Sequence, residues 1–420
     1  MHKLRSMHKN LPSEGNEKEG TVRTMDEFDV ILVGAGPAGL YTSEKLAKMN
    51  LNVLCVDKKQ EIGVPKRCGE GLGLNWMNKL GIEPNKRWAV QEIEGAALYT
   101  PSGKKVELRF PDTAGYVIER RIFEKELAFK AAKAGANIRV KSNVLDLKRE
   151  NGKVNVFLRG PKGDEEYSAP LIIAADGVET QTARKLGVNT VNKLNDIDSG
   201  YQYEMSNIDF DDPDLINLWF GTDVAPRGYV WIFPKGKDHA NVGIGIGGTE
   251  EKSAKEYLDK WIATQPGIAK GSIIEVNAGA IPVGGFLEDM CADNLMIIGD
   301  AAHQVNPIHG GGMGIAMEAG LIAADVAKTA FDKKNFSHDV LKTYNTEWYE
   351  KSGNRLMKIL KMRYMLENLK DPDFETLGDA LTGEDVMLMT KGNILESAAM
   401  VSKKLIKYPE LARLMLKYLK

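Results

Sequence analysis

Three glycines at a fixed spacing could hold the phosphates of a dinucleotide. Gly34, Gly36 and Gly39 form G-x-G-x-x-G directly after the apolar run 28–33 and at the start of a helical pattern. The first glycine permits a tight turn, the second lets a pyrophosphate approach the backbone, and the third lets the helix pack closely on the strand. The helix N-terminus adds free N–H groups and a positive dipole end. This pattern predicts an adenine dinucleotide site.

Three acidic residues each follow a short apolar run that reads as a buried parallel strand. Asp57 follows the second strand and is placed to bond a ribose hydroxyl. Asp176 begins an Asp-Gly pair, which taken alone is more often only a turn. Asp300 stands in Gly-Asp at the end of a later strand, where a carboxylate can bond a ribityl hydroxyl.

Two further glycine groups have different readings. The cluster 310–312 precedes a helical pattern and offers a second helix N-terminus to a phosphate or to the carbonyl edge of a ring. Gly243, Gly245 and Gly248 repeat the G-x-G-x-x-G spacing, but no strand with a terminal acid follows at the usual distance. Because Gly243, Gly245 and Gly247 alternate, we interpret them as one bare face of a strand that admits close approach.

Apolar periodicity indicates the elements that position these residues. The spacing predicts a helix over 120–134, a hairpin over 144–159 with Asn151-Gly152 as its turn, and a helical tail from about 320. Residues 195–290 carry aromatic residues in alternating runs, which predicts a second, mostly antiparallel sheet. The loop predicted over 58–74, directly after Asp57, is dense in glycine.

Length and composition exclude several classes of protein. A chain of 420 residues is too long for one compact core. The net charge of −2 argues against a general nucleic-acid binder. The 3 cysteines are too few and too scattered for a disulfide framework or a zinc site. We therefore predict that the protein binds no metal and resides in a reducing cytoplasm. No apolar stretch approaches the roughly 20 residues that span a bilayer.

The motifs together resemble a known superfamily. G-x-G-x-x-G, then Asp-Gly, then Gly-Asp-Ala-Ala-His with Pro307 and the glycine cluster, is similar to the FAD domain of flavoprotein hydroxylases. Two other stretches, PKRCGEG at 65–71 and PRGYVWIFPKG at 226–236, resemble signatures of the geranylgeranyl reductase family. Its archaeal branch saturates the prenyl chains of digeranylgeranylglycerol phospholipids, and the resemblance runs from about residue 26 to the C-terminus.

The resemblance implies an α/β fold with α+β elements: an FAD-binding Rossmann-like domain, a second mainly antiparallel β-sheet substrate domain and a helical C-terminal region. We expect residues 1–24 to be a disordered extension. The other domain boundaries that we predict are 25–94, 116–190 and 291–335 for the FAD domain, 95–115 and 191–290 for the substrate domain, and 336–420 for the helical region.

The resemblance also implies roles for individual residues. Cys68 would lie beside the isoalloxazine, Val144 would touch the adenine end through its backbone, and Tyr229, Trp231 and Phe233 would line a prenyl tunnel. His303 is expected at a helix start near the cofactor rather than in catalysis. The residues that we expect to bind FAD are Gly34, Gly36, Ala38, Gly39, Asp57, Arg67, Cys68, Gly69, Gly71, Arg120, Val144, Asp176, Asp300, Gly311, Gly312 and Met313.

Cys68 is the candidate catalytic residue. An isolated prenyl double bond is a poor hydride acceptor, so proton delivery must lead or accompany hydride transfer, which requires an acid in a dry pocket. An apolar wall would raise the pKa of the thiol, whereas the neighbouring cation Arg67 would lower it. The alternative is that Cys68 only packs on the ring.

Other activities stay open from the sequence. A flavin monooxygenase, a non-enzymatic prenyl carrier and a reductase of chlorophyll or quinone side chains are compatible with the same motifs. The electron donor is also open among NAD(P)H, a ferredoxin and a deazaflavin. The lipid-borne substrate predicts a peripheral protein at the inner face of the cell membrane, attached through basic helical segments near the C-terminus. The candidate segment 411–420 is otherwise a helix packed on the core.

Overall fold

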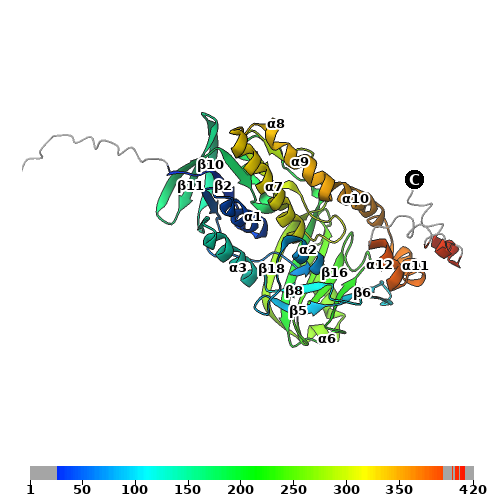
Figure 1. The fold of residues 1–420 in the computed structure, drawn as a ribbon. Helices are drawn as coiled ribbons and strands as arrows, with labels where there is room; N and C mark the ends of the chain where they lie inside the picture. Colours follow the sequence, from blue (N-terminus) through cyan, green and yellow to red (C-terminus); the bar gives the residue numbers. More distant parts are fainter. Residues whose placement is uncertain (1–25, 391–399, 401–402, 406, 412–420) are drawn as a thin grey trace, which may run out of the picture.

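The computed structural model describes residues 26–390, 400, 403–405 and 407–411 (Figure 1). The predicted extension 1–24 and almost all of the predicted helix 411–420 lie outside the described residues. Two large sheets, each with its own hydrophobic core, occupy the two halves of the molecule in Figure 1.

The first sheet is a six-stranded sheet with the order β19-β20-β13-β2-β3-β9. Its five strands from β20 to β9 are parallel, and only β19 runs antiparallel to its neighbour. The central strands are apolar along their whole length because both faces are covered. The strands are β2 (Val30–Val33), β3 (Val53–Val56), β9 (Asn137–Arg139), β13 (Leu171–Ala174), β19 (Cys291–Ala292) and β20 (Leu295–Ile297).

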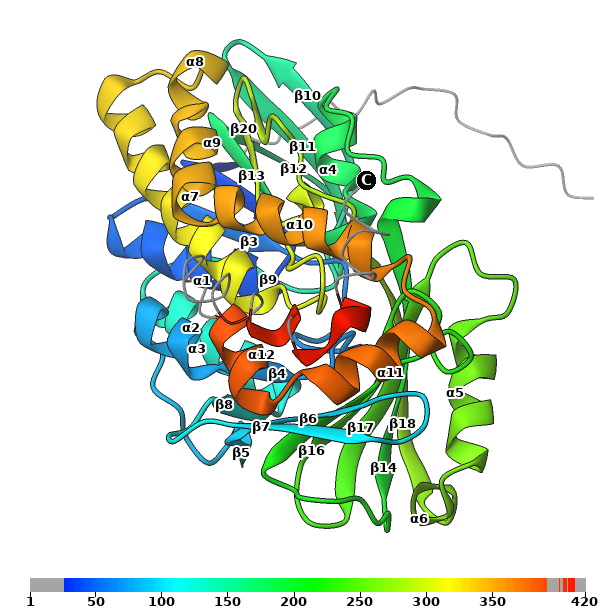
Figure 2. The same ribbon diagram turned by 90° about the vertical axis from the view of Figure 1, so that its right-hand side faces the viewer.

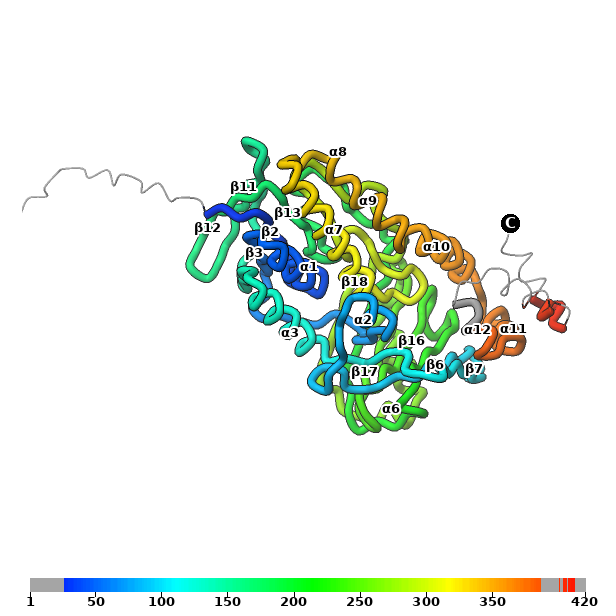
Figure 3. The backbone as a smooth tube through the Cα atoms, in the orientation of Figure 1, coloured from blue at the N-terminus to red at the C-terminus, as the bar shows by residue number. Residues whose placement is uncertain are grey.

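Helices and a smaller sheet cover the two faces of this parallel sheet. Helix α1 (Pro37–Lys48) packs between α3 (Arg120–Lys133) and α7 (Met313–Lys333) on one face. A four-stranded sheet also packs on the parallel sheet: its strand β11 contacts β13, and its strand β12 contacts β2 (Figure 3). The strands of that sheet are β1 (Asp26–Glu27), β10 (Asn143–Glu150), β11 (Lys153–Gly160) and β12 (Gly163–Ala169).

The second large sheet has seven strands in the order β18-β14-β17-β16-β15-β6-β7. All neighbours are antiparallel except the parallel pair β15 and β6. Helix α5 (Ala254–Ala263) lies against β14 and β17 beside the short α6 (Pro266–Ala269) (Figure 2). The strands are β6 (Gly95–Tyr99), β7 (Lys105–Arg109), β14 (Ile197–Ser206), β15 (Leu215–Trp219), β16 (Tyr229–Pro234), β17 (His239–Gly247) and β18 (Ser272–Pro282).

Side-chain alternation gives this sheet two different faces. Val230, Ile232, Val242 and Ile244 point to one face and form a core with Leu258 of α5. The residues between them point to the opposite face, because successive side chains of a strand alternate. These are Tyr229, Trp231 and Phe233 of β16 and Asn241, Gly243 and Gly245 of β17.

A three-stranded sheet and short helices connect the two halves. Strand β8 (Gly115–Ile118) pairs with β4 (Gly71–Gly73) and β5 (Ala89–Ile93), and α2 (Leu74–Leu80) follows β4 directly. Strand β4 lies within the stretch predicted as loop 58–74, so that prediction is wrong at its C-terminal end.

The C-terminal part is helical, as predicted. The helices α8 to α12 follow α7, and a π-helical turn at Tyr349–Gly353 separates α9 from α10. No helix among the described residues has both the length and the apolar character needed to cross a bilayer. The bounds are α4 (Gln181–Lys185) earlier in the chain, then α8 (His338–Leu341), α9 (Thr343–Trp348), α10 (Asn354–Leu366), α11 (Asp371–Ala380) and α12 (Gly383–Thr390).

The predicted fold class is confirmed, and the hairpin and the helix over 120–134 appear where the sequence placed them. The domain boundaries stay a prediction. The expectation for His303 is wrong: it ends the 3₁₀ turn Gly299–Ala302 with φ of 60°, and α7 begins only at Met313. The glycine cluster 310–312 intervenes, and its last glycine precedes the first helical residue.

The bare face of β17 yields the first testable prediction. A Cβ on Gly243 would lie 2.4 Å from the Trp231 ring, whereas one on Gly245 would lie 3.7 Å from it. Gly243→Ala should therefore displace the indole and destabilise the protein by about 1–3 kcal/mol. Gly245→Ala, the matched control, should be close to neutral. Thermal unfolding and tryptophan emission measure both effects, and equal behaviour of the two variants would contradict this packing.

Candidate functional site

The turn between β2 and α1 has the geometry that a dinucleotide needs. Gly34 has φ of 110°, and a Cβ there would lie 2.2 Å from the Ala175 carbonyl oxygen. A Cβ on Gly39 would lie 1.9 Å from the Gly34 carbonyl oxygen, so only glycine lets the helix approach the turn. A Cβ on Gly36 would meet nothing within 4 Å. The three glycines therefore match the turn, packing and close-approach positions of the motif.

Asp57 is fixed at the end of β3 beside this turn. Its Oδ2 accepts a hydrogen bond from the Ala35 backbone N–H at 2.8 Å, and its Oδ1 accepts from Lys59 N–H at 2.8 Å. The Ser142 N–H donates to the Asp57 carbonyl oxygen at 2.8 Å, which places the start of β10 and half-buried Val144 near the same end of the sheet. Ala38 is buried in the first turn of α1.

Asp176 offers a test of whether these residues fit a cofactor. Its Oδ2 accepts from Thr182 N–H at 2.8 Å, but its buried Oδ1 has no hydrogen-bond partner among the described residues. Burial raises the pKa of this carboxyl group, and the Thr182 N–H opposes the rise. A buried acceptor without a partner is costly unless a ligand supplies a donor. Together with the open space at Gly36, this fits a hydroxyl-bearing dinucleotide.

Cys68 lies half-buried in the loop before β4, and its Sγ accepts a hydrogen bond from Glu70 N–H at 3.2 Å. Burial raises the pKa of the thiol, while the Arg120 guanidinium lowers it in part. The sequence pointed to Arg67 as that cation, and this expectation is wrong. Arg67 is exposed and its guanidinium lies 3.6 Å from Glu179, so it is paired there rather than with the thiol. The net effect keeps Cys68 in the thiol form at neutral pH.

Asp300 interacts electrostatically with Arg120, the cation that also acts on Cys68, and the glycine cluster lies beside Asp300. A Cβ on Gly312 would lie 3.2 Å from the Asp300 carboxylate, and Met313 begins α7 next to it. Gly311 N–H donates to Nδ1 of His309 at 3.1 Å. Burial raises the pKa of Asp300 and lowers the pKa of His309 to about 4.

These groups are partly accessible to solvent although protein surrounds them. The pKa of His309 shifts as in a buried site, yet its side chain is exposed, and Cys68 and Asp300 are likewise partly accessible.

Side chains of the seven-stranded sheet contact both the segment with His309 and the loop with Cys68. Tyr229 donates its hydroxyl proton to the His309 carbonyl oxygen at 2.7 Å, and the Trp231 indole N–H donates to Oε1 of Gln202 at 2.9 Å. The Gln202 amide in turn donates to the Cys68 carbonyl oxygen at 3.1 Å. A small cavity of about 60 Å³ lies between Cys68, Gln202 and Trp231.

Phe233 has a different contact from its two neighbours on β16. Cβ atoms on Gly69 and Gly71 would lie 2.9 and 3.1 Å from its ring, so the ring covers both glycines of the Cys68 loop. The three residues predicted to line the tunnel have three different contacts. Trp231 borders the small cavity, Tyr229 bonds His309 just before the glycine cluster, and the Phe233 ring packs on the Cys68 loop.

The sequence reasoning missed a cluster of buried charges that joins the two halves. Glu70 has no exposed surface, and its Oε2 accepts hydrogen bonds from Lys66 at 3.1 Å, Lys235 at 3.0 Å and Asn241 at 2.8 Å. Its Oε1 accepts from Arg120 N–H at 2.8 Å. Lys66, Glu70, Glu204 and Lys235 are called the buried ion cluster below.

Lys66, Lys235 and Glu204 of the buried ion cluster are charged at neutral pH. Burial alone lowers the pKa of Lys66 and Lys235, but nearby carboxylates, Glu70 first, raise both above the ordinary value. Burial alone raises the pKa of Glu204, but His239 and the two lysines bring it well below its usual range. A signal for the cluster was present, because Lys66, Glu70 and Lys235 all lie within the two stretches that carry the family resemblance.

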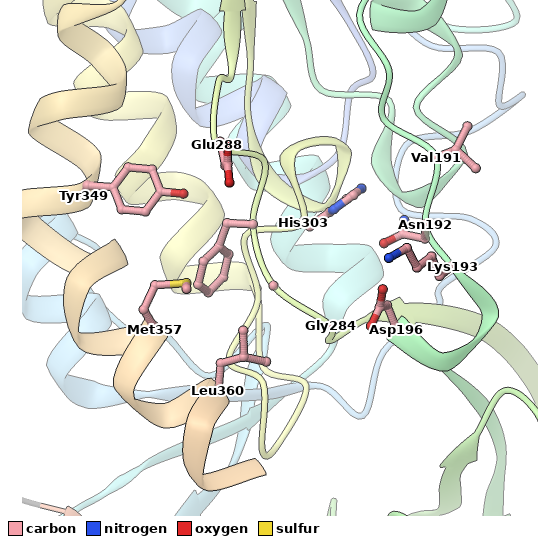
Figure 4. Close-up of a pocket in the computed structure, with 12 residues that line it drawn as sticks. Val191, Asn192, Lys193, Asp196, Gly284, Glu288, His303, Tyr349, Met357 and Leu360 are labelled. Atoms are coloured by element: carbon pink, nitrogen blue, oxygen red, sulfur yellow. The ribbon is translucent and has the colours of Figure 1, made fainter. Parts of the chain in front are cut away.

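A larger cavity of about 290 Å³ lies elsewhere in the molecule (Figure 4). It is bordered by the loop with Lys193 and Asp196, by Phe286, by His303 and by Met357 and Leu360 of α10. None of the residues predicted for the site lines it. His303 is buried here and its Nε2 lies 3.2 Å from the Thr190 carbonyl oxygen.

Comparison with known proteins identifies both halves of the chain. Residues 196–281 match the geranylgeranyl reductase catalytic domain family, and residues 32–66 match an NAD(P)-binding Rossmann-like domain family. The first match includes β14 to β18, and the second covers the β2–α1 turn and β3.

Individual relatives extend this match over nearly the whole chain. The digeranylgeranylglycerophospholipid reductase of Methanocaldococcus jannaschii is 39% identical over 385 residues, which cover 90% of this chain and 97% of the relative. A solved geranylgeranyl bacteriochlorophyll reductase-like protein from Thermoplasma acidophilum is 34% identical with a TM-score of 0.84, and the match covers 94% of this chain and 100% of that one.

A more distant structure shares the fold alone. The myxobacterial chondrochloren halogenase, a variant of FAD-dependent halogenases, is 19% identical with a TM-score of 0.68, and the match covers 81% of this chain and 83% of that one. The predicted family is confirmed: this chain belongs to the geranylgeranyl reductase family, in its digeranylgeranylglycerophospholipid reductase branch.

Proposed function

We propose that this chain is an FAD-dependent reductase that saturates the double bonds of geranylgeranyl chains on archaeal ether-lipid precursors. The β2–α1 turn and Asp57 would hold the adenine half of FAD, and Asp176, Asp300 and the glycine cluster would hold the rest. When bound and reduced, FAD supplies a hydride equivalent. The relatives' names support a prenylated glycerophospholipid as the substrate.

The chain's own residues must supply the proton. Saturating one carbon–carbon double bond consumes one hydride and one proton, and hydride addition alone would leave an unstabilised carbanion. Cys68 is a thiol at neutral pH, because burial raises its pKa, and Arg120 beside it would stabilise the thiolate that forms when the proton leaves. Arg120 would thus act on the thiol by positioning and charge.

One observation carries this proposal most directly. Cys68, Gln202 and Trp231 border the same small cavity, and Gln202 bonds both the Trp231 indole and the Cys68 backbone. The proposed acid therefore lies on the same cavity as the Trp231 indole. We place the reaction at the inner face of the cell membrane, where a prenyl lipid resides, with the protein attached peripherally.

Lipid analysis in a heterologous host tests the function. A host that makes unsaturated archaeal ether lipids should accumulate species with two more hydrogen atoms per saturated bond when this protein is present. Gly36→Val is the matched control, because a Cβ there would meet no atom of the described residues within 4 Å, yet the side chain would occupy the space of a pyrophosphate. It should fold, lose the yellow colour of bound flavin and leave the lipids unsaturated.

Mass spectrometry of the lipids and absorbance of the purified proteins provide the two readouts. Unchanged lipids in the presence of a yellow wild-type protein would contradict the reductase. Unchanged lipids with a colourless protein would favour a carrier, and oxygen-dependent products would favour a monooxygenase. If only quinone side chains became saturated, the protein would be a reductase of the same family with a different prenyl substrate.

The second functional prediction concerns Cys68. Cys68→Ala should retain FAD and lose alkene reduction by roughly 10²–10⁴-fold, the usual contribution of a general acid. Cys68→Ser should recover little, because a hydroxyl is a much weaker acid than a thiol. In the wild type, activity should fall as the pH rises through the raised pKa of the thiol, since only the protonated form donates.

The measurement is the rate of lipid saturation against pH, with dithionite as reductant, for the wild type and both variants. The flavin should be reduced equally well in all three, which shows that the redox half is intact. A Cys68→Ala enzyme that keeps the wild-type rate and pH profile would show that the thiol only packs in the site.

A further inference from the structure

Helix α10 has an unusual outward face. Its sequence NRLMKILKMRYML contains four basic residues and no acidic one. Leu356, Leu360 and Arg363 point inward, and the opposite arc is exposed. That arc carries Arg355, Lys358 and Lys361 together with three large apolar side chains that are 37–48% exposed: Met357, Met362 and Tyr364.

The three outward cations are not neutralised by protein carboxylates. Within the described residues, no ion pair involves Arg355, Lys358 or Lys361, whereas inward-facing Arg363 pairs with Asp198 and Glu367. Cations interleaved with exposed apolar side chains on one helix face are the pattern of helices that lie in a membrane interface.

A second segment shows the same combination. The loop Val191-Asn192-Lys193-Leu194 follows α4 by a few residues, and the side chains of Val191 and Leu194 are 64% and 68% exposed. Exposed large apolar side chains that gather at one place mark interaction surfaces more often than scattered ones do. Lys193 between them also enters no ion pair within the described part of the chain.

The two segments belong to one face of the molecule. Val191 and Lys193 border the 290 Å³ cavity on one side, and Met357 and Leu360 border it on the other (Figure 4). The Tyr364 hydroxyl lies 3.4 Å from the Gly284 carbonyl oxygen at the same cavity, which ties α10 to the loop between the two. The acids Asp196 and Glu288 also border the cavity, but neither belongs to the α10 arc.

We propose that this face, formed by the outer arc of α10 and the loop 191–194, docks the protein on an anionic phospholipid surface. The lysines would lie at the level of the headgroup phosphates, and Val191, Leu194, Met357 and Tyr364 would enter the acyl boundary. The proposal deepens the proposed function and rests on it, because a reductase of lipid-borne chains must reach a membrane. It places the contact on α10 rather than on the segment 411–420.

Vesicle flotation of the full-length protein with its bound FAD tests this surface. The wild type should float with vesicles of phosphatidylcholine containing about one third phosphatidylglycerol and should be released at high salt. Lys358→Gln/Lys361→Gln should weaken the partition roughly 30-fold, at about fivefold for each lysine near the surface. Val191→Ser/Leu194→Ser should weaken it at least about 10-fold and at both salt concentrations.

The matched control is Lys252→Gln/Lys260→Gln, which removes the same charge near and on α5, against the other face of the seven-stranded sheet. This variant should float like the wild type. The proposal is overturned if Lys358→Gln/Lys361→Gln floats normally, or if the control loses as much binding, since net charge rather than this face would then govern adsorption.

A second assay separates this proposal from the function on which it rests. With a prenyl phospholipid dissolved in detergent, the α10 and loop variants should keep the wild-type rate and FAD content, because none of the changed residues lines the site with Cys68. Loss of reduction in detergent by the wild type itself would refute the reductase and leave the flotation result standing. Loss by the docking variants alone would refute a pure docking role.

Discussion

Glu70 is a carboxylate without exposed surface, and the site depends on how its charge is balanced. Two lysines, one amide and one backbone N–H donate to its two oxygens, while its own N–H donates to the Cys68 thiol. Lys66 belongs to the Cys68 loop, whereas Lys235 directly follows β16 and Asn241 lies in β17 of the seven-stranded sheet, so one buried carboxylate joins the loop to that sheet. Breaking such a pair leaves an uncompensated buried charge, which typically costs 3–5 kcal/mol. The buried ion cluster therefore fixes the distance between thiol and aromatic wall.

The seven-stranded sheet satisfies two demands through side-chain alternation. One face packs apolar side chains against α5, and the other presents Gln202, Trp231 and glycines to the small cavity beside Cys68. Glycine at 243 is required because the Trp231 ring occupies the space of its side chain. Because Gly243 has no side chain, the indole can lie close to the sheet and donate a hydrogen bond to Gln202. The Gln202 amide in turn donates to the Cys68 carbonyl oxygen. Packing and chemistry thus use alternate residues of the same strands.

Much of the fold could be predicted from the sequence because glycine spacing and buried apolar runs are local signals. The Gly34–Gly39 turn, the strand ending at Asp57 and the bare face of β17 were predicted on that basis. Long-range contacts could not be predicted: adjacency favoured Arg67 as the cation that acts on Cys68, but the Arg67 guanidinium pairs with Glu179, and Arg120 from another element acts on the thiol. His303 was misplaced because a 3₁₀ turn and a glycine cluster precede the helix. The buried ion cluster was missed since charged residues are usually solvated, and only the pairing of distant segments buries them.

A double-mutant cycle between Glu70 and Lys235 tests most directly whether the buried ion cluster holds the site together. Glu70→Gln, Lys235→Met and the double variant would be compared with the wild type by free energy of unfolding and by rate of lipid saturation, with FAD content as the control for folding. Each single change removes one partner of a buried charge and leaves it only its remaining charged partners, Lys66 for Glu70 and Glu119 and Glu204 for Lys235. The double variant should therefore lose less than the sum of the singles, with a coupling of about 1–3 kcal/mol and a matching non-additivity in rate. Strictly additive losses in both measurements would contradict the account, because the two halves would then be held independently.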